Sequence, residues 1–144
     1  MKQEYWINVK HVDNRMVVFL NGVTIWDSGI VHGDPELNKF INITEELSSQ
    51  SSHTSELIFE GFNDTYNPDD NKEELNPWHF NYRVIERTIN SAGQVIKEEN
   101  ILAPYNERHL SNPNTRAINN CYQLKGTSTG VKVISNTLSQ HFYN

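Results

Sequence analysis

Hydrophobic and polar residues alternate along several short segments at the start of the chain. In Tyr5–Val12 the apolar residues recur at every second position, which predicts a strand with one buried face. Met16–Leu20 is a continuous apolar run, short enough for a strand that is buried on both faces. Asn21-Gly22 follows it as a two-residue hairpin signal, so Val23–Trp26 is the expected return strand.

The same pattern continues through the middle of the chain. Further strands are predicted at 40–43, 57–62, 80–88 and 94–102, with one helical turn at 44–47 and shorter strand candidates at 121–124 and 131–135. In 80–88 the inward positions are Phe80, Tyr82 and Val84. Turn signals recur roughly every 8–12 residues, which is typical of an antiparallel sandwich. We therefore expect an all-β, jelly-roll-like sandwich of about eight strands. It is expected as a single domain over 1–144, in which 104–144 is a less regular C-terminal extension.

Composition agrees with strands and loops. Of the 144 residues, 19 are asparagine and 3 are alanine. Alanine is the best helix former, whereas asparagine prefers turns and caps. No segment of ten or more residues carries a convincing helical apolar stripe.

Charge and hydropathy narrow the classes of partner. The chain has 18 acidic and 12 basic residues, for a net charge of −6, so nucleic acid is not an expected partner. No apolar run approaches the roughly 18 residues of a membrane span, so membrane insertion is not expected. The N-terminal segment lacks the apolar core of a classical signal peptide, so the expected location is either the cytoplasm or, after export by a non-classical route, outside it. Cys121 is alone, which excludes an intramolecular disulfide.

The segment 60–84 begins and ends like a strand, with an acidic loop between. Calcium takes six to eight oxygen ligands, and carboxylates and amide oxygens are abundant here. The candidate Ca²⁺ ligands are Asn63, Asp64, Asp69, Asp70 and Asn71. The alternative is a solvated acidic turn that begins at Pro68 and Asp69.

Aromatic residues next to this loop suggest a sugar site. An apolar pyranose face stacks on an aromatic ring while polar side chains bind the hydroxyls around it. The candidate ligand-binding residues are Trp78, His79, Tyr66, Asp64, Asp70, Asn71 and Trp26. Trp78 lies at the junction of loop and strand, and the alternative is that it caps the core. Trp26 is followed by a loop that contains Asp27, His32 and Asp34.

Catalytic motifs are missing from the sequence. Asp69 and Asp70 are adjacent, and adjacent carboxylates rarely converge on one substrate. There is no serine-hydrolase or cysteine-histidine signature and no phosphate-binding glycine loop, so no enzyme is expected. The six histidines form no HxH or HxxxH pair, so the spacing does not support a zinc cluster, and surface or loop positions are expected for them.

Four pieces of the chain, in order, resemble the galactose-binding-like jelly-roll modules. First, an aspartate turn at Asp13 leads into a strand that ends in Asn21-Gly22, and second, an "NIT..L" element spans Asn42–Leu47. Third, a strand ends at Asn63, and fourth, an aromatic strand carries Trp78, Phe80 and Tyr82. The segment "FNDTYNPDDN" is also similar to the calcium-dependent galactose-binding lectins. The resemblance covers about residues 5–90 and implies carbohydrate binding, with Asn63, Asp64, Thr65, Asp70 and Asn71 as the matching positions for calcium.

Two functions follow from these observations. The first is a carbohydrate-binding module or lectin, calcium-dependent if the loop holds the ion, with its sugar at a loop end of the sandwich. The second is a non-catalytic protein-interaction module, such as an adaptor, an assembly subunit or a toxin-neutralising partner. A homodimer is expected because lectins gain avidity from several sites. The segment Val131–Ser135 is the candidate sheet edge for pairing.

Overall fold

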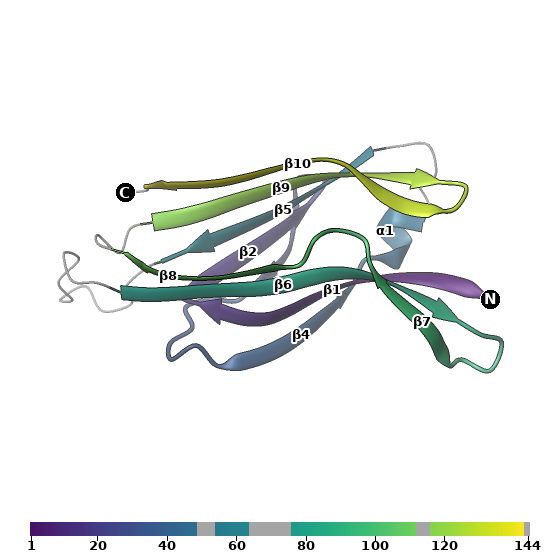
Figure 1. Ribbon diagram of the computed structural model, residues 1–144, viewed down its shortest axis with the longest axis horizontal. Helices are drawn as coiled ribbons and strands as arrows, with labels where there is room; N and C mark the ends of the chain where they lie inside the picture. The colour runs from purple at the N-terminus through teal and green to yellow at the C-terminus, as the bar shows by residue number, and fades with distance from the viewer. Residues whose placement is uncertain (49–53, 64–75, 112–115, 143–144) are drawn as a thin grey trace.

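The computed structural model describes residues 1–48, 54–63, 76–111 and 116–142 (Figure 1). The described residues form the strands β1 (Lys2–Asp13), β2 (Arg15–Leu20), β3 (Val23–Asp27), β4 (Glu36–Asn42), β5 (Thr54–Phe62), β6 (Asn76–Ile89), β7 (Val95–Asn100), β8 (Tyr105–Ser111), β9 (Arg116–Thr127) and β10 (Gly130–Phe142). The helix α1 (Thr44–Ser48) lies between β4 and β5. Across these ranges, no helix has both the length and the apolar character needed to cross a membrane.

The strands build two antiparallel sheets that pack as a sandwich (Figure 1). The first sheet has the order β4-β1-β6-β7, with β8 also paired to β6, and the second has the order β10-β9-β5-β2-β3. The chain changes sheet after β1, β3, β4, β5 and β8. The predicted all-β sandwich is confirmed, and the described residues hold ten strands rather than about eight. One strand absent from the prediction is β8, whose polar sequence conceals its pairing with β6.

The first hairpin forms as its sequence predicts. Met16 and Val18 are buried on β2, and β3 returns antiparallel beside it. Asn21 and Gly22 both have positive φ, 51° and 80°, which matches the twist that a two-residue hairpin needs. Strand β4 begins earlier than predicted, at Glu36, because its exposed polar residues pair with β1 without an apolar alternation.

An aromatic stack crosses the core from one sheet to the other. Phe59 of β5 stacks on Tyr82 of β6 with ring centroids 3.7 Å apart, and Tyr82 stacks in turn on Tyr105 of β8 at 5.2 Å. Tyr122 of β9 packs edge-on against Phe59 and Tyr82. Asn120 is buried beside them and donates a hydrogen bond to the Tyr82 hydroxyl at 2.8 Å. The stack therefore ties both sheets together through residues that are far apart in the sequence.

The C-terminal part of the chain is a component of the sandwich, so the prediction that 104–144 is a less regular extension is wrong. Strand β9 lies between β5 and β10 in the second sheet. Ile118, Tyr122 and Leu124 of β9 are buried in the core. These apolar positions alternate with polar ones, and asparagines at 119 and 120 interrupt the pattern enough to conceal it in the sequence.

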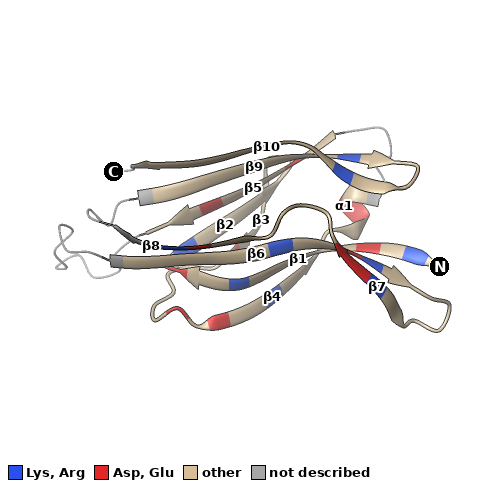
Figure 2. Cartoon of the chain, viewed as in Figure 1, with Lys and Arg blue, Asp and Glu red and all other residues tan. Residues whose placement is uncertain are grey.

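Two strands, β7 and β8, pair with the same edge of β6, each along a different part of its length. Residues Ile85–Ile89 pair with β7, and residues Asn76–Tyr82 pair with β8. The chain leaves the sheet at residues 101–104 before it returns as β8. Arg83 and Arg87 of β6 form ion pairs with Glu98 of β7 at 2.9 and 3.0 Å. Figure 2 shows the mixed basic and acidic residues on this hairpin.

Candidate functional site

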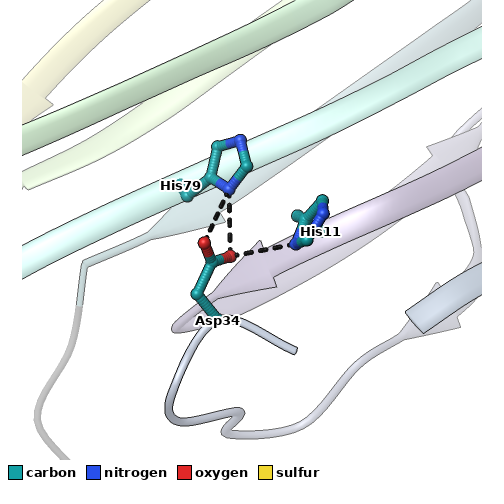
Figure 3. A group of neighbouring side chains, drawn as sticks. All are labelled: His11, Asp34 and His79. Carbon is teal, nitrogen blue, oxygen red and sulfur yellow. Dashed lines mark hydrogen bonds and ion pairs between the residues drawn. The ribbon is translucent and has the colours of Figure 1, made fainter. Parts of the chain in front are cut away.

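A cluster of polar side chains lies on the first sheet, on the face opposite the core. It comprises His11 from β1, His79 from β6 and Asp34 from the loop between β3 and β4; we refer to these three residues as the histidine cluster (Figure 3). Phe80 and Tyr82 point into the core, so the neighbouring position 79 points to the other face of the sheet. The ligand atoms of the cluster lie within 4.8 Å of one another.

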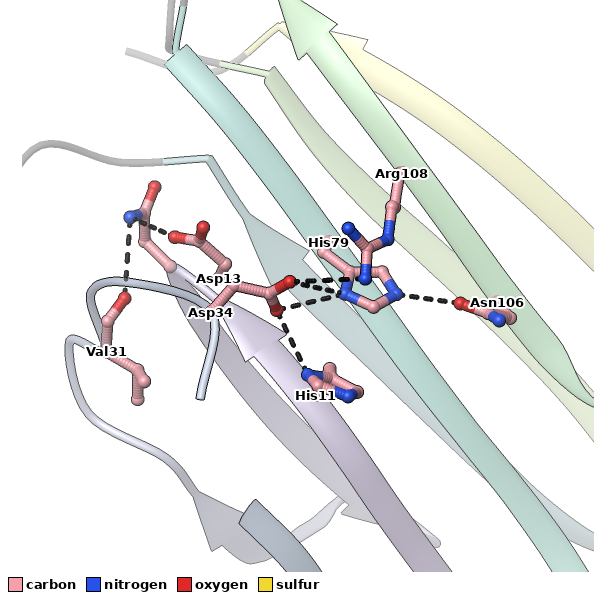
Figure 4. A network of polar contacts seen from close by, with 8 residues as sticks. His11, Asp13, Val31, Asp34, His79, Asn106 and Arg108 are labelled. Carbon is pink, nitrogen blue, oxygen red and sulfur yellow. Dashed lines mark hydrogen bonds and ion pairs between the residues drawn. The ribbon is translucent and has the colours of Figure 1, made fainter. Parts of the chain in front are cut away.

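Asp34 reaches the cluster because its loop is bound to the start of β2. The Val31 amide donates to the Asn14 carbonyl at 2.6 Å, and the Asn14 side-chain amide donates to the Val31 carbonyl at 3.4 Å (Figure 4). Gly33 and Asp34 follow with positive φ, 79° and 50°. A positive φ is uncommon for a residue with a side chain, and it costs conformational energy. This conformation directs the Asp34 carboxylate towards β1 and β6 (Figure 3).

His79 is buried, with 4% of its surface exposed, and both of its ring nitrogens are bonded. Its Nδ1 lies 2.9 and 3.0 Å from the two carboxylate oxygens of Asp34. Its Nε2 lies 2.7 Å from Oδ1 of Asn106 on β8 (Figure 4). An amide oxygen only accepts hydrogen bonds, so with the amide oriented in this way Nε2 carries a proton.

His11 contacts both other members of the cluster. Its ring lies against the His79 ring, with centroids 4.7 Å apart and an angle of 31° between the planes. Its Nδ1 is 3.2 Å from Oδ1 of Asp34. The contact is short enough for an ion pair, but its direction does not meet hydrogen-bond geometry, and the buried Nδ1 has no hydrogen-bond partner among the described residues.

Two further charged groups border the cluster. Asp13 is buried beside it and accepts a hydrogen bond from the Asn14 side chain at 2.6 Å. Burial raises the pKa of Asp13 to about 6; the negative charge of Asp34 adds to this shift, and His32 and His79 oppose it. On the other side, Nη2 of Arg108 is 3.7 Å from Oδ2 of Asp34 (Figure 4). The cluster thus has a carboxylate neighbour on one side and a guanidinium on the other.

A separate groove opens between the edges of the two sheets. It lies between β8 and β10 and has a volume of about 590 Å³. Its walls combine apolar, aromatic and polar residues, principally Leu102, Tyr105, Glu107, Tyr122, Asn136 and Leu138. Tyr105 and Tyr122 belong to the aromatic cluster of the core, so this wall of the groove is backed by packed core residues.

The predicted exposed platform at Trp78 is wrong. Trp78 is 1% exposed and lies in the core, where its ring packs against Phe80 and His109 at 5.7 and 4.4 Å. The β6 strand begins two residues before Trp78 and directs the side chain inward, so the ring is not free to stack on a sugar. Trp26 is half-buried and packs against the core from β3.

The predicted loop residues are only partly described. Asp64, Tyr66, Asp69, Asp70 and Asn71 lie outside the described residues. Asn63 lies within them, directly after β5, and its side chain is fully buried.

Sequence reasoning selected Asp34 and His79 in separate contexts, and the fold brings these two residues together. It missed His11, Asn106 and Arg108. The prediction of surface or loop positions for the histidines is wrong for His79 and for the half-buried His11, both of which lie on strands. No spacing rule could have paired His11 with His79, because strands far apart in the sequence become neighbours only through the antiparallel pairing of β1 with β6.

Comparison with protein-family models, with curated proteins and with solved structures finds no match to this chain.

Proposed function

We propose that this protein is a non-catalytic carbohydrate-binding module that holds its sugar in the groove between β8 and β10. The observation that supports the proposal is the groove itself, with its volume of about 590 Å³ and its mixed lining. Sites for small molecules are typically concave, about 300–1,000 Å³, and mostly apolar with a few polar groups.

The lining of the groove suits the two surfaces of a pyranose. Leu102 and Leu138 offer apolar contact for the C–H face of a sugar ring. Glu107 can accept hydrogen bonds from hydroxyls, and the Asn136 amide can both donate and accept. This combination replaces the aromatic platform that was predicted at Trp78.

Calcium binding is a separate part of the proposal. The oxygen-rich loop with Asp64, Asp69, Asp70 and Asn71, which follows Asn63 in the sequence, would hold Ca²⁺. Sugar binding in the groove does not require that ion.

A glycan array tests the proposal when it is run with CaCl₂ and with EDTA. We expect binding to a restricted set of glycans by the wild-type protein. Asn136→Ala and Glu107→Gln should reduce this binding, whereas Thr137→Ala should not, because Thr137 lies on the same strand but outside the groove. Absence of glycan binding under both conditions would contradict the proposal. Binding that is unaffected by both groove variants would place the sugar elsewhere.

A second candidate function, protein association, is favoured by the outer edge of β10. This strand has 13 residues, is paired on one side with β9 and lies at the edge of its sheet. Ile134 is 56% exposed and Leu138 is 53% exposed. An exposed edge of this length is a template for pairing with another strand. We propose a second copy of the chain as the partner, because antiparallel pairing of two β10 edges about a two-fold axis near Ile134 would bring the exposed Ile134 side chains of both copies together.

Light scattering tests this association. A dimer is expected at high micromolar concentration, and Ile134→Lys should convert it to a monomer. A monomeric wild-type protein would contradict the association while leaving the sugar proposal intact.

A further inference from the structure

Two imidazole nitrogens approach the same carboxylate oxygen in the histidine cluster. Nδ1 of His79 is 2.9 Å and Nδ1 of His11 is 3.2 Å from the same Asp34 oxygen. One ligand atom from each of the three residues lies within 4.8 Å of the other two. Ligands about 2.0–2.2 Å from a tetrahedral zinc ion lie roughly 3.3–3.6 Å apart, so small rotations of the rings would bring all three to that spacing.

The protonation of His79 favours a cation at its Nδ1. Nε2 carries a proton because it faces the Asn106 oxygen at 2.7 Å. Nδ1 of a neutral ring therefore presents a lone pair to a carboxylate, and this contact is repulsive unless a proton or a metal ion lies between them. An N–H that donates to an amide oxygen is also the usual support of a metal-bound histidine, because it fixes the tautomer and the orientation of the ring.

His11 provides an independent indication. Its Nδ1 is buried and has no hydrogen-bond partner among the described residues, although Oδ1 of Asp34 is only 3.2 Å away. A buried polar atom left in this state costs about 1–3 kcal/mol. Ligands of one ion point at the ion rather than at each other. A short contact without hydrogen-bond alignment is therefore what a shared metal ion produces.

The third ligand is held in place by its loop. Asp34 has a φ of 50°, and hydrogen bonds between Asn14 and Val31 attach the loop to the sheet. Strain of this kind at a non-glycine residue is found mainly at functional sites, where the surrounding structure maintains it. His11 and His79 lie on adjacent strands of the sheet, and Asp34 lies on a loop that is bonded to it. The three side chains therefore need little rearrangement to bind an ion.

We propose that His11, Asp34 and His79 bind a divalent transition metal ion, with Zn²⁺ as the best match. Two imidazole nitrogens and one carboxylate oxygen match the ligand preference of Zn²⁺, whereas Ca²⁺ and Mg²⁺ prefer oxygen ligands. His11 and Asp34 are half-buried, so water can occupy the fourth position. None of the three ligand residues lines the sugar groove or belongs to the predicted calcium loop, although Asn106, which bonds His79, does line the groove.

The surrounding charges permit a cation. Asp13 adds a carboxylate beside Asp34, and His32 also lies close enough to affect Asp13. Arg108 opposes a cation, but its side chain is 72% exposed and can turn towards solvent.

Isothermal titration of tag-free, EDTA-treated and dialysed protein with ZnCl₂ tests the proposal. We expect one Zn²⁺ per chain and a rise in Tm of about 5–10 °C when the free ion is at about 100 times its Kd. CaCl₂ should give neither effect at this site. Co²⁺ should give the visible absorption bands of a tetrahedral ion.

Two variants and one control locate the site. His11→Ala removes a ligand whose Nδ1 has no hydrogen-bond partner among the described residues, and Asp34→Asn keeps a side chain that tolerates positive φ. Each should lower the affinity for Zn²⁺ at least tenfold. His32→Ala, an exposed histidine on the same loop, should bind as the wild type does. The proposal is overturned if the wild type shows no binding at about 1 mM Zn²⁺, or if both variants retain wild-type affinity.

Discussion

The phenol oxygens of Tyr82 and Tyr122 lie 2.5 Å apart in the core, one from each sheet. Asn120 also donates to the Tyr82 oxygen, so the two phenols and this amide form one buried hydrogen-bond network in which either phenol can donate to the other. Tyr122→Phe should lower the free energy of unfolding by about 1–3 kcal/mol, because it removes the hydrogen-bond partner of the buried Tyr82 hydroxyl. Urea denaturation measures this loss. An unchanged midpoint would show that the pair contributes nothing.

Alkaline pH should destabilise the fold through its buried tyrosines. Burial is the main cause that raises the pKa of Tyr5 to about 12, and Glu86 adds to this shift. Burial also raises the pKa of Tyr105 to about 12, and the negative charge of Glu107 adds to that shift. The pKa values of Tyr82 and Tyr122 are also raised, by burial first. The folded state therefore keeps protons that the unfolded chain loses near pH 10, and stability falls as the pH rises above that value.

Absorbance at 295 nm follows this ionisation directly. Four of the six tyrosines should remain un-ionised until the protein unfolds, so ionisation and the loss of the circular dichroism signal should coincide. Reversible titration of all six near pH 10 in the folded protein would contradict the burial of these groups.

Asp13→Asn should stabilise the protein above pH 6. The pKa of Asp13 is raised to about 6, so its contribution to stability is complete below about pH 4 and is lost as the pH rises through 6. Asparagine keeps an oxygen for the Asn14 side chain and carries no charge. We expect a gain on the order of 1 kcal/mol at pH 8 and almost none at pH 4, measured in EDTA. A gain that does not depend on pH would contradict this account.

Gly61 has no room for a side chain. A Cβ at this position would lie 2.6 Å from Cζ of Phe80 and 2.9 Å from Cγ1 of Ile118. Gly61→Ala should therefore destabilise the protein by about 1–3 kcal/mol through overpacking. Adding Phe80→Leu should recover part of the loss, because it removes the closest atoms. Two losses that simply add in the double variant would mean that the clash is not with Phe80.

Trp78→Ala should destabilise the fold by about 3–5 kcal/mol, because it leaves a large cavity in the core. Trp78→Phe should cost less, since it also removes the indole Nε1, which is buried without a partner among the described residues. Thermal or urea unfolding of both variants measures the difference. Wild-type stability in Trp78→Ala would return Trp78 to the surface role predicted from the sequence.

Local patterns predicted most of the fold. The alternation in β1, the apolar run of β2 and the hairpin at Asn21-Gly22 each carry their structure within a few residues. Strand β8 has no such pattern, because it lies at an edge and takes its conformation from β6. Ile85 is also fully buried, although it is not among the inward positions predicted for 80–88.

The histidine cluster could not be predicted from local sequence patterns, because it forms only when β1 pairs with β6, a strand far from it in the sequence. The register that sets His11 beside Asn81 and Asp13 beside His79 follows from a β-bulge after Val9 and from the pairing of β1 with β6. Asp34 was visible as an acidic loop residue, but its direction is decided by a positive φ. A pattern of residue types contains neither of these facts.

The topology has a consequence for how the chain is synthesised and folded. Strand β1 pairs along its length with β6, from Lys2 opposite Ile89 to Asp13 opposite His79. Strand β5 pairs with β9, from Thr54 opposite Lys125 to Phe62 opposite Ala117. Pairings at such long sequence separation close large loops and are slow to form. Neither sheet can be completed on the ribosome until most of the chain has emerged. The apolar residues of β1 and β2 therefore remain exposed to solvent during synthesis, and aggregation competes with folding in that interval.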